Sequence, residues 1–442
     1  MRKFLAAIAL VGFMVLSLGI GYSQAGEIDI LLQKLVEKGV LTPGEAQQIG
    51  TETKEQVKQE ISTGKYSSLP EWVQNTKLKG DFRVRYQLDH AKADASAATN
   101  NSADRNRGRV RLRLGLDTKV NDKIMVGAGI ATGTTDVTSY DSARSNNQSF
   151  ANAFAKKPLV LDYAYAKYTP VSWASLMGGK MKYLPWRPTD VMIDNDITPE
   201  GGVLQLSKKL NSKVNLFMDN MLFVLSETEP ATHNAMAYAT QGGLEYQLTD
   251  NFSLKGAVSY YNFSNVKGRA LDGSTGSNSK SIGAGVTGLN KYSYRDITPA
   301  VEVGIKSPFK AISNATGLSA LDIEKISFFG EYYNNLAAPA KNTGFAIGST
   351  FGHEKVDAWA KWQLQWVYSM LEKDAIPDTL PDSDRYGGKT GIRGNKVSLQ
   401  YGLGKNTWLQ FAAFRFENIA MDTATTRRAP TTVIQADWNM KW

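Results

Sequence analysis

Four arginines occupy every second position between residues 107 and 113, and this spacing is the clearest chemical signal in the chain. They are Arg107, Arg109, Arg111 and Arg113. Alternate side chains of an extended strand point to opposite faces, so the four arginines share one face and the apolar residues between them share the other. Three basic residues of the preceding predicted strand are expected to face the same way as the four arginines: Lys79, Arg83 and Arg85. Stacked cations repel one another in a low-dielectric interior, so this basic ladder requires water or carboxylates beside it.

A second group of charged residues lies further along the chain. The connection that we expect at residues 185–202 carries four carboxylates: Asp190, Asp194, Asp196 and Glu200. One hypothesis places them opposite the basic ladder, where the field between the two sets of charges would define a constriction for ions. The alternative is a solvated loop, beside a wall whose charges only keep the interior wet.

The remaining chemical signals indicate neither an enzyme nor a metal site. The chain has no cysteine, which excludes disulfides and thiolate ligands. The histidines His90, His233 and His353 are scattered without the spacing of metal ligands. Residues 283–288 match G-x-G-x-x-G but lack the strand-to-helix context of a dinucleotide fold. No nucleophile motif is present in the sequence, so we expect no catalysis, no cofactor, no bound metal and no nucleic-acid partner.

The elements that must position the charged residues are strands, because the hydrophobic period is two from residue 76 onward. Phe82, Val84 and Tyr86 alternate with charged residues, for example, and similar segments follow to the end of the chain. We count about 16 segments, with 18 as the alternative if a long loop hides a hairpin. The facing of the segments at 158–169, 175–184 and 213–225 is ambiguous. The expected ranges are 76–88, 107–119, 123–133, 158–169, 175–184, 202–209, 213–225, 235–248, 252–264, 292–306, 323–335, 341–352, 358–371, 390–404, 408–418 and 430–442.

The segment before these strands has a different character. Arg2 and Lys3 precede an apolar run and the small residues of a cleavage site, so residues 1–25 are expected to be a signal peptide cleaved after Ala25. Residues 26–75 are expected to form a periplasmic helical segment and a linker. Gly39 is a plausible helix end, and Thr42 begins a capping box with Pro43 at the first helical position. Residues 76–442 are expected to be one transmembrane β-barrel.

The connections and the final residue favour a barrel in lipid over a soluble sheet. Tight turns mostly follow even-numbered strands and long polar loops mostly follow odd ones, as in outer-membrane barrels. The loop at 307–322 breaks this rule and is expected to hold a short helix. So many strands must hide their edges, which closure achieves. The chain ends on an alternating strand whose last residue is Trp442, resembling the signal that outer-membrane barrels present to their assembly machinery.

The chain resembles the putative-porin family of Gram-negative outer membranes over essentially its full mature length. The resemblance implies a 16-stranded antiparallel barrel with a short helical segment before it, and its third external loop is expected to enter the lumen. It implies little about the solute, because the substrates of the family are mostly unassigned. The stretches that carry it are residues 30–42, 109–116 and 179–201, the last being the most specific.

These observations predict a water-filled channel for passive diffusion of small hydrophilic solutes and ions, with a weak preference for anions. Three alternatives stay open: a structural or adhesive barrel with an occluded lumen, an outer-membrane enzyme, which would need a nucleophile at the rim of the lumen, and a secreted soluble β-protein. The expected location is the outer membrane. The expected partners are membrane lipid and lipopolysaccharide, the barrel assembly machinery, small hydrophilic solutes and further copies of the chain in a homotrimer.

Overall fold

A computed structural model describes most of the chain beyond the expected signal peptide. The described residues are 26–63, 71–91, 104–139, 141–151, 153–227, 234–281, 288–317, 323–419 and 430–442. The signal peptide at residues 1–25, His233 and most of the glycine motif at 283–288 lie outside them. The described residues form two compact units that divide after Gln74.

The first unit is helical. Helix α2 ends at Glu37, before Gly39, whose positive φ of 70° suits glycine at a helix terminus. Thr42 and Glu45 form the expected capping box, in which the Glu45 carboxylate accepts from the Thr42 backbone N–H at 2.8 Å. No helix in the described part of the chain is long and apolar enough to cross a membrane. The helices of this unit are α2 Gly26–Glu37, α3 Pro43–Thr63 and α4 Glu71–Gln74.

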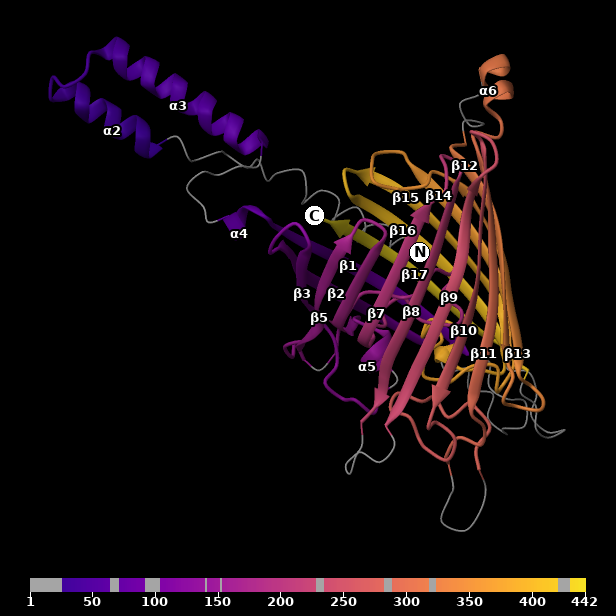
Figure 1. Cartoon of the computed structure of the whole chain (residues 1–442). Coiled ribbons are helices and arrows are strands. Elements are labelled where there is room, and N and C mark those ends of the chain that lie inside the picture. Colours follow the sequence, from indigo (N-terminus) through magenta and orange to yellow (C-terminus); the bar gives the residue numbers. More distant parts are fainter. Residues whose placement is uncertain are drawn as a thin grey trace. The chain divides into compact units, whose positions relative to one another are not determined.

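The second unit is a closed antiparallel β-barrel (Figure 1). Seventeen strands form one sheet; β4 is a two-residue strand paired only with β2, and the other sixteen make the ring. The expected 16-stranded barrel is therefore confirmed, and only β4 was not anticipated. The strands are β1 Thr76–Ala91, β2 Arg105–Lys119, β3 Ile124–Thr132, β4 Gln148–Ser149, β5 Leu159–Val171, β6 Ala174–Lys180, β7 Glu200–Lys209, β8 Val214–Ser226, β9 Ala235–Gln247, β10 Phe252–Ser264, β11 Tyr294–Lys306, β12 Lys325–Asn335, β13 Thr343–Gly352, β14 Trp362–Leu371, β15 Ile392–Gly404, β16 Thr407–Asn418 and β17 Thr431–Lys441. Three short helical elements interrupt the connections: α5 Asp141–Arg144, α6 Lys310–Thr316 and η2 Tyr386–Gly388.

The barrel closes between its first and last strands. Eleven residue pairs join β1 to β17, from Asp81–Lys441 to Ala91–Thr431. Trp442 extends the ladder by one step, because its backbone exchanges two hydrogen bonds with Gly80, at 3.0 and 3.1 Å. The absence of a side chain on Gly80 leaves room for the Trp442 indole, which a Cβ there would meet at 2.3 Å.

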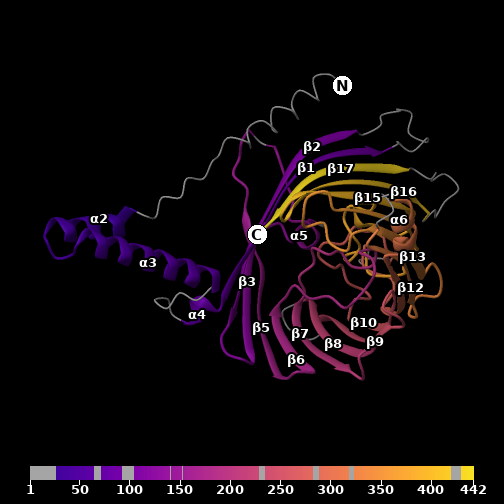
Figure 2. The same cartoon turned by 90° about the horizontal axis from the view of Figure 1, so that it is seen from above.

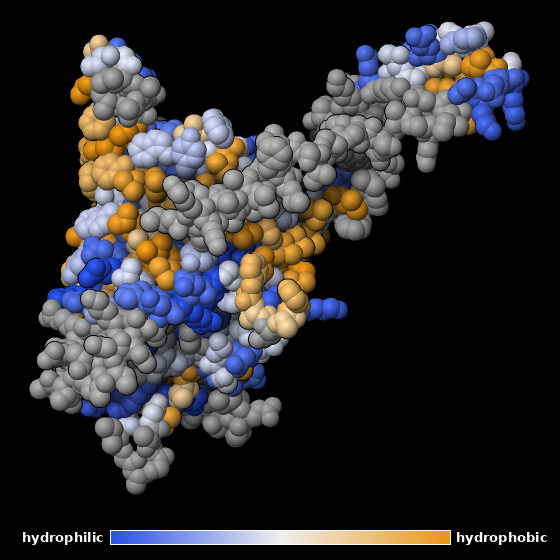
Figure 3. All heavy atoms as spheres, turned by 180° about the vertical axis from the view of Figure 1, so that it is seen from behind, coloured by the Kyte–Doolittle hydropathy of each residue, from blue (hydrophilic) through white to orange (hydrophobic). Residues whose placement is uncertain are grey.

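The outer face of the barrel wall is apolar and the inner face is largely polar. On β2 the exposed Leu114 and Leu116 point outward while the alternate arginines before them point inward, as the alternation predicts. Exposed leucine, valine, isoleucine and aromatic side chains recur on most other strands. Figure 3 shows this apolar surface over the wall, with hydrophilic residues gathered toward the end that carries the long loops. Such a belt is what a lipid-facing surface requires.

Four long connections at the same end of the barrel have described residues that enter its interior; the connections span residues 133–158, 181–199, 265–293 and 372–391, of which 140, 152 and 282–287 are not described (Figure 2). Several of their apolar side chains, among them Met192, Ile193 and Ile376, are almost fully buried, and they belong to one cluster with inward-facing side chains such as Phe223 and Phe263. This explains the ambiguous facing of residues 213–225, since both faces of β8 are apolar where the loops cover it. Among the described residues, the buried cluster has members on strands from β6 to β17 and none on β1, β2, β3 or β5.

Candidate functional site

The basic ladder lies on the inner wall of the two strands that the sequence pattern indicated. Arg83 stands opposite Arg111 in the register of β1 and β2, and Arg85 stands opposite Arg109. The four guanidinium groups therefore cluster on one patch of the inner wall. Among the described residues, the buried apolar cluster that the inserted loops form has no member on these two strands. Lys79 lies two residues before Asp81 and is half exposed.

Most cations of the ladder have a carboxylate partner, and several of these partners lie on the wall itself. Arg85 donates to Asp437 of β17 at 2.8 and 2.9 Å and contacts Asp384 of the 372–391 loop at 3.1 Å. Arg109 instead donates to Gln87, Ser145 and the carbonyl of Asn147. The other ion pairs are Lys79–Asp117, Arg83–Asp437 at 3.6 Å, Arg107–Asp89 at 2.8 Å, Arg111–Asp81 at 2.9 Å and Arg113–Asp196 at 2.5 Å. Seven cations thus face six carboxylates.

Of the four acidic residues expected at a constriction, the structure brings Asp196 to the ladder. Its carboxylate accepts from Arg113, and Arg113 also donates to Asn146 at 2.9 Å. Burial opposes ionisation of Asp196, but the charges of Arg113 and Arg111 outweigh it and hold its pKa well below the usual range. Asp196 is therefore ionised at neutral pH and joins the 181–199 loop to β2.

The other three acidic residues have different partners. Asp190 contacts Arg385 of the 372–391 loop at 2.7 Å and Lys396 of β15 at 2.8 Å, four strands from β2 around the ring. Asp194 accepts from the backbone N–H of Ser383, and its burial, reinforced by Asp382 and Asp196, raises its pKa well above the usual value.

Glu200 requires a correction, because it is the first residue of β7 and not part of the loop. It pairs with Lys180 across the β6–β7 ladder and is mostly exposed. The strand predicted at residues 202–209 begins two residues earlier, at Glu200, because the glycines at 201 and 202 give no alternating hydrophobic signal.

The 181–199 loop crosses the lumen, because it is fixed to strands all around the ring. The backbone of Trp186 exchanges two hydrogen bonds with the Gln241 side chain of β9. Thr189 donates to Glu331 of β12, and Asp190 pairs with Lys396 of β15. With the Arg113–Asp196 contact on β2, these anchors hold the loop across the interior at the level of the ladder.

The loops are also tied to one another by Arg144, which is almost fully buried. Its guanidinium donates to the carbonyls of Gly273, Asp378, Pro381 and Gly388 at 3.0–3.2 Å. Asp378 in turn accepts from residues 274–278, including the Ser277 N–H at 2.7 Å. Three of the inserted loops therefore form one hydrogen-bonded body inside the barrel.

Two cavities lie beside the ladder, one on each side of Arg113. The larger, about 430 Å³, extends toward the turn-bearing end of the barrel and is lined by Lys79, Asp81, Arg113, Tyr163, Lys182 and Trp442, among others. The smaller, about 200 Å³, is lined by Arg113, Asn146, Asp162, Lys182, Arg187 and Asp196, among others. Both include Arg113 and Lys182, so these two side chains form the neck between them. We call the smaller space the neck cavity.

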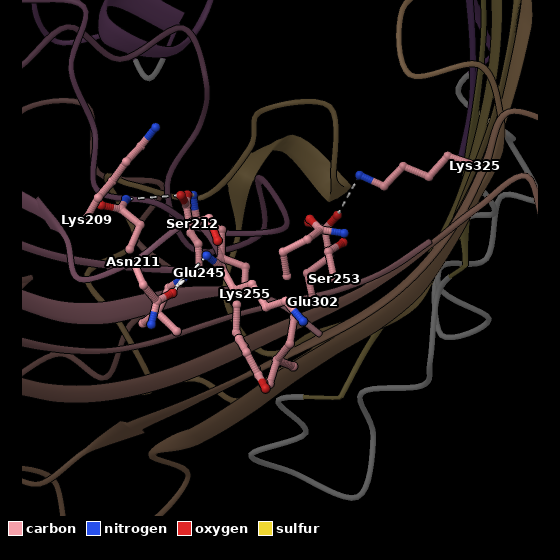
Figure 4. A pocket seen from close by; sticks show the side chains of 14 residues that line it. Lys209, Asn211, Ser212, Glu245, Ser253, Lys255, Glu302 and Lys325 are labelled. Carbon is pink, nitrogen blue, oxygen red and sulfur yellow. Dashed lines mark hydrogen bonds and ion pairs between the residues drawn. The ribbon is translucent and has the colours of Figure 1, made fainter. Parts of the chain in front are cut away.

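A third cavity, of about 340 Å³, lies at the turn-bearing ends of β7–β12 (Figure 4). Its walls carry Lys209, Lys255 and Lys325, with Glu245 and Glu302 as partners. The cation of Lys255 also lies 5.0 Å from the ring of Trp186, beneath the 181–199 loop. This third cavity is also polar, and it lies on the side of the lumen that the inserted loops cover.

Apart from Asp196, sequence reasoning missed the carboxylate partners of the ladder, although Asp437 left a signal. It is the one acidic residue at an inward position of the last strand, where barrel closure brings it opposite Arg85. Asp384 left no comparable signal, since it lies in a loop whose path depends on tertiary packing. His90 contacts Asp104 and His353 contacts Trp362, and in the described part of the chain no group of three acidic or histidine side chains could hold a metal.

Comparisons with known proteins agree with the barrel. Among solved structures, OprB of Pseudomonas putida matches with a TM-score of 0.51 and 8% identity, covering 83% of this chain and 94% of that one. A double mutant of the porin of Rhodopseudomonas blastica matches with a TM-score of 0.40 and 9% identity, covering 83% of this chain and all of that one. No curated protein sequence matches the chain significantly. The family model described as "Putative porin" matches residues 45–99, 89–287 and 285–441, so the chain belongs to the putative-porin family and is a porin-like channel protein of the outer membrane.

Proposed function

We propose that this channel admits small hydrophilic solutes and ions by passive diffusion along the wall formed by β1, β2, β3 and β5, with a weak preference for anions and no catalytic role. The position of the hydrophobic cluster supports this route. The cluster joins the inserted loops to strands β6–β17, whereas the charged wall beside it holds the two cavities that meet at Arg113 and Lys182. An apolar filling excludes water and ions on one side, so a wet path is expected on the other.

The charge balance supports the proposed anion preference. The ladder has one more cation than carboxylate, and the neck cavity repeats this excess with three cations and two carboxylates. These cations are Arg113, Lys182 and Arg187, and the carboxylates are Asp162 and Asp196. A single uncompensated charge in a narrow passage is expected to bias selectivity modestly without excluding cations.

Single-cysteine variants test the route, because the natural chain has no cysteine to interfere. Lys182 lines both cavities and its side chain is 41% exposed. A bulky methanethiosulfonate attached to Lys182→Cys should lower single-channel conductance in planar bilayers. The matched control is Lys208→Cys, on the exposed outer face of β7, where the same reagent should have no effect. Unchanged conductance in labelled Lys182→Cys would refute the route, and no conductance in the unmodified protein would favour the occluded barrel.

The length of β6 supports the proposal that the protein is a homotrimer. This strand has seven residues, fewer than the roughly 9–11 that a spanning strand needs, so the wall is low at this point. Leu159, Leu161 and Leu176 are exposed beside it, and a neighbouring copy would cover them and the low wall together. Sedimentation in detergent should give three copies per particle, and Leu161→Lys should shift the particle to one copy. The outer-face variant Leu399→Lys serves as the control.

The assignment of residues 1–25 to a cleaved signal peptide, of residues 26–75 to a periplasmic segment and of Trp442 to recognition by the assembly machinery remains part of the proposal. N-terminal sequencing of protein purified from the outer membrane should begin at Gly26.

A further inference from the structure

An apolar cavity lies between the inserted loops and the wall, on the loop side of the neck cavity. It has a volume of about 280 Å³ and is lined mainly by aliphatic and aromatic side chains. Among these are Ile193, Phe223, Phe263 and Leu380, which come from two different loops and two strands. A path for purely hydrophilic solutes has no need of such a space, because sugars and inorganic ions lose hydrogen bonds with water on entering it.

The apolar cavity adjoins the neck cavity. Leu184, Ile197 and Thr198 line both of them. The 181–199 loop therefore presents apolar side chains to one space and charged side chains to the next within a few residues. A molecule lying across the shared residues would meet a hydrophobic surface at one end and a cationic surface at the other.

Arg187 supplies the cation at this junction. Its guanidinium donates to the Ile193 carbonyl at 2.8 Å and to the Asn195 amide oxygen at 2.7 Å, so neutral groups fix its position. Among the described residues it has no ion pair, unlike Arg113 and Lys182, whose charges Asp196 and Asp162 balance. A guanidinium held by carbonyl oxygens keeps its charge available for a carboxylate, which it binds in a planar, charge-assisted geometry.

We propose that the apolar cavity and the neck cavity form one binding site for small organic anions that carry an apolar body, with aromatic carboxylates as the class that fits best. The carboxylate lies at Arg187 and the ring lies among Phe223, Phe263 and Leu380. This inference rests on the proposed channel function and names a class of solute for it. The site slows such anions in passage and so raises their selection over inorganic anions at low concentration.

Current recordings from the whole protein in planar bilayers test the site with benzoate as the probe. Acetate has the charge without the ring, and benzamide has the ring without the charge. Benzoate should produce reversible interruptions of the single-channel current at concentrations at least tenfold below those at which acetate or benzamide does so. Equal effects of the three probes would overturn the inference. That result would leave the channel function intact, whereas the absence of any current in potassium chloride would defeat the channel function itself.

Substitutions test the cationic end and the apolar end of the site one at a time. Arg187→Ala should weaken the benzoate effect about tenfold or more, and Arg187→Lys should restore part of it, because the charge returns without the planar geometry. Ile197→Ser should weaken the effect of benzoate and leave that of acetate unchanged. Arg295→Ala is the control, since Arg295 is exposed on the outer phase of β11. A full benzoate effect in Arg187→Ala, with conductance equal to that of the natural protein, would overturn the assignment.

Discussion

Replacing Arg113 with alanine should reduce the anion preference of the channel, because this side chain stands at the neck between the two cavities of the basic wall. The change removes one of the three cations that line the neck cavity and leaves two cations and two carboxylates there. It also removes the partner of Asp196 at 2.5 Å and a contact to Asp81 at 3.8 Å. The neck cavity then has no net charge, and Asp196 loses its direct ion-pair partner.

The size of the effect follows from Coulomb's law. An anion passing at roughly 6 Å from the lost charge would lose about 0.7 kcal/mol of attraction in bulk water and about 3 kcal/mol at an effective dielectric constant of 20. The same change favours a passing cation by an equal amount, so the ratio of anion to cation permeability should fall by about tenfold on the bulk-water figure and by more where the dielectric constant is lower. Screening acts over about 10 Å at 0.1 M salt, so the effect should be larger in dilute solution.

Reversal potentials across a potassium chloride gradient measure this ratio directly. Heat-modifiable electrophoretic migration shows in the same preparation that the variant is folded. Arg295 lies on the outer face of β11, so Arg295→Ala is a control that removes an arginine without changing the lumen. An unchanged reversal potential in folded Arg113→Ala would refute the placement of Arg113 on the ion path.

Three further predictions concern the loops and the closure of the ring. Burial and the charges of Asp190 and Asp384 raise the pKa of Asp382 to about 7, above its usual value, so the folded loops bind a proton that the unfolded chain releases between about pH 4 and 7. The stability of the loops should therefore fall as pH rises through this window, and trypsin cleavage of the loops should increase toward pH 8. Asp382→Asn should abolish this pH dependence. A pH dependence that persists in Asp382→Asn would contradict the assignment to Asp382. Arg144→Ala leaves four buried carbonyls without their donor and should destabilise the loop body by about 3–5 kcal/mol, seen as noisier current and faster loop proteolysis with an intact barrel. Gly80→Ala forces a Cβ to within 2.3 Å of the Trp442 ring and should lower barrel stability by about 1–3 kcal/mol in urea titrations, whereas equal stability would show that the indole moves freely.

The wall of the barrel could be predicted from the sequence, and the interior could not. Strand positions and the inward direction of Arg109 and Arg111 follow from a period of two, which is a local property of the chain. The partners of these arginines depend on register and closure, which local patterns do not encode. Asp384 and Arg144 were missed because each acts through contacts more than 200 residues away in the sequence. The apolar loop residues 191–193 gave no periodic signal, although a run of valine, methionine and isoleucine in a polar loop indicates that the loop is buried.

The strand that completes the ring also delivers the carboxylate that stands opposite Arg85. Arg83 and Arg85 both contact Asp437, which lies 352 residues after Arg85. Before β17 pairs with β1, the two guanidinium groups have no contact with this carboxylate. Closure of the seam therefore also places a carboxylate beside both guanidinium groups, so a chain that lacks β17 would have an open edge, would leave Arg83 without Asp437 and would leave Arg85 with Asp384 alone. Such truncated products cannot settle into a stable cylinder, and quality control by proteolysis is expected to remove them.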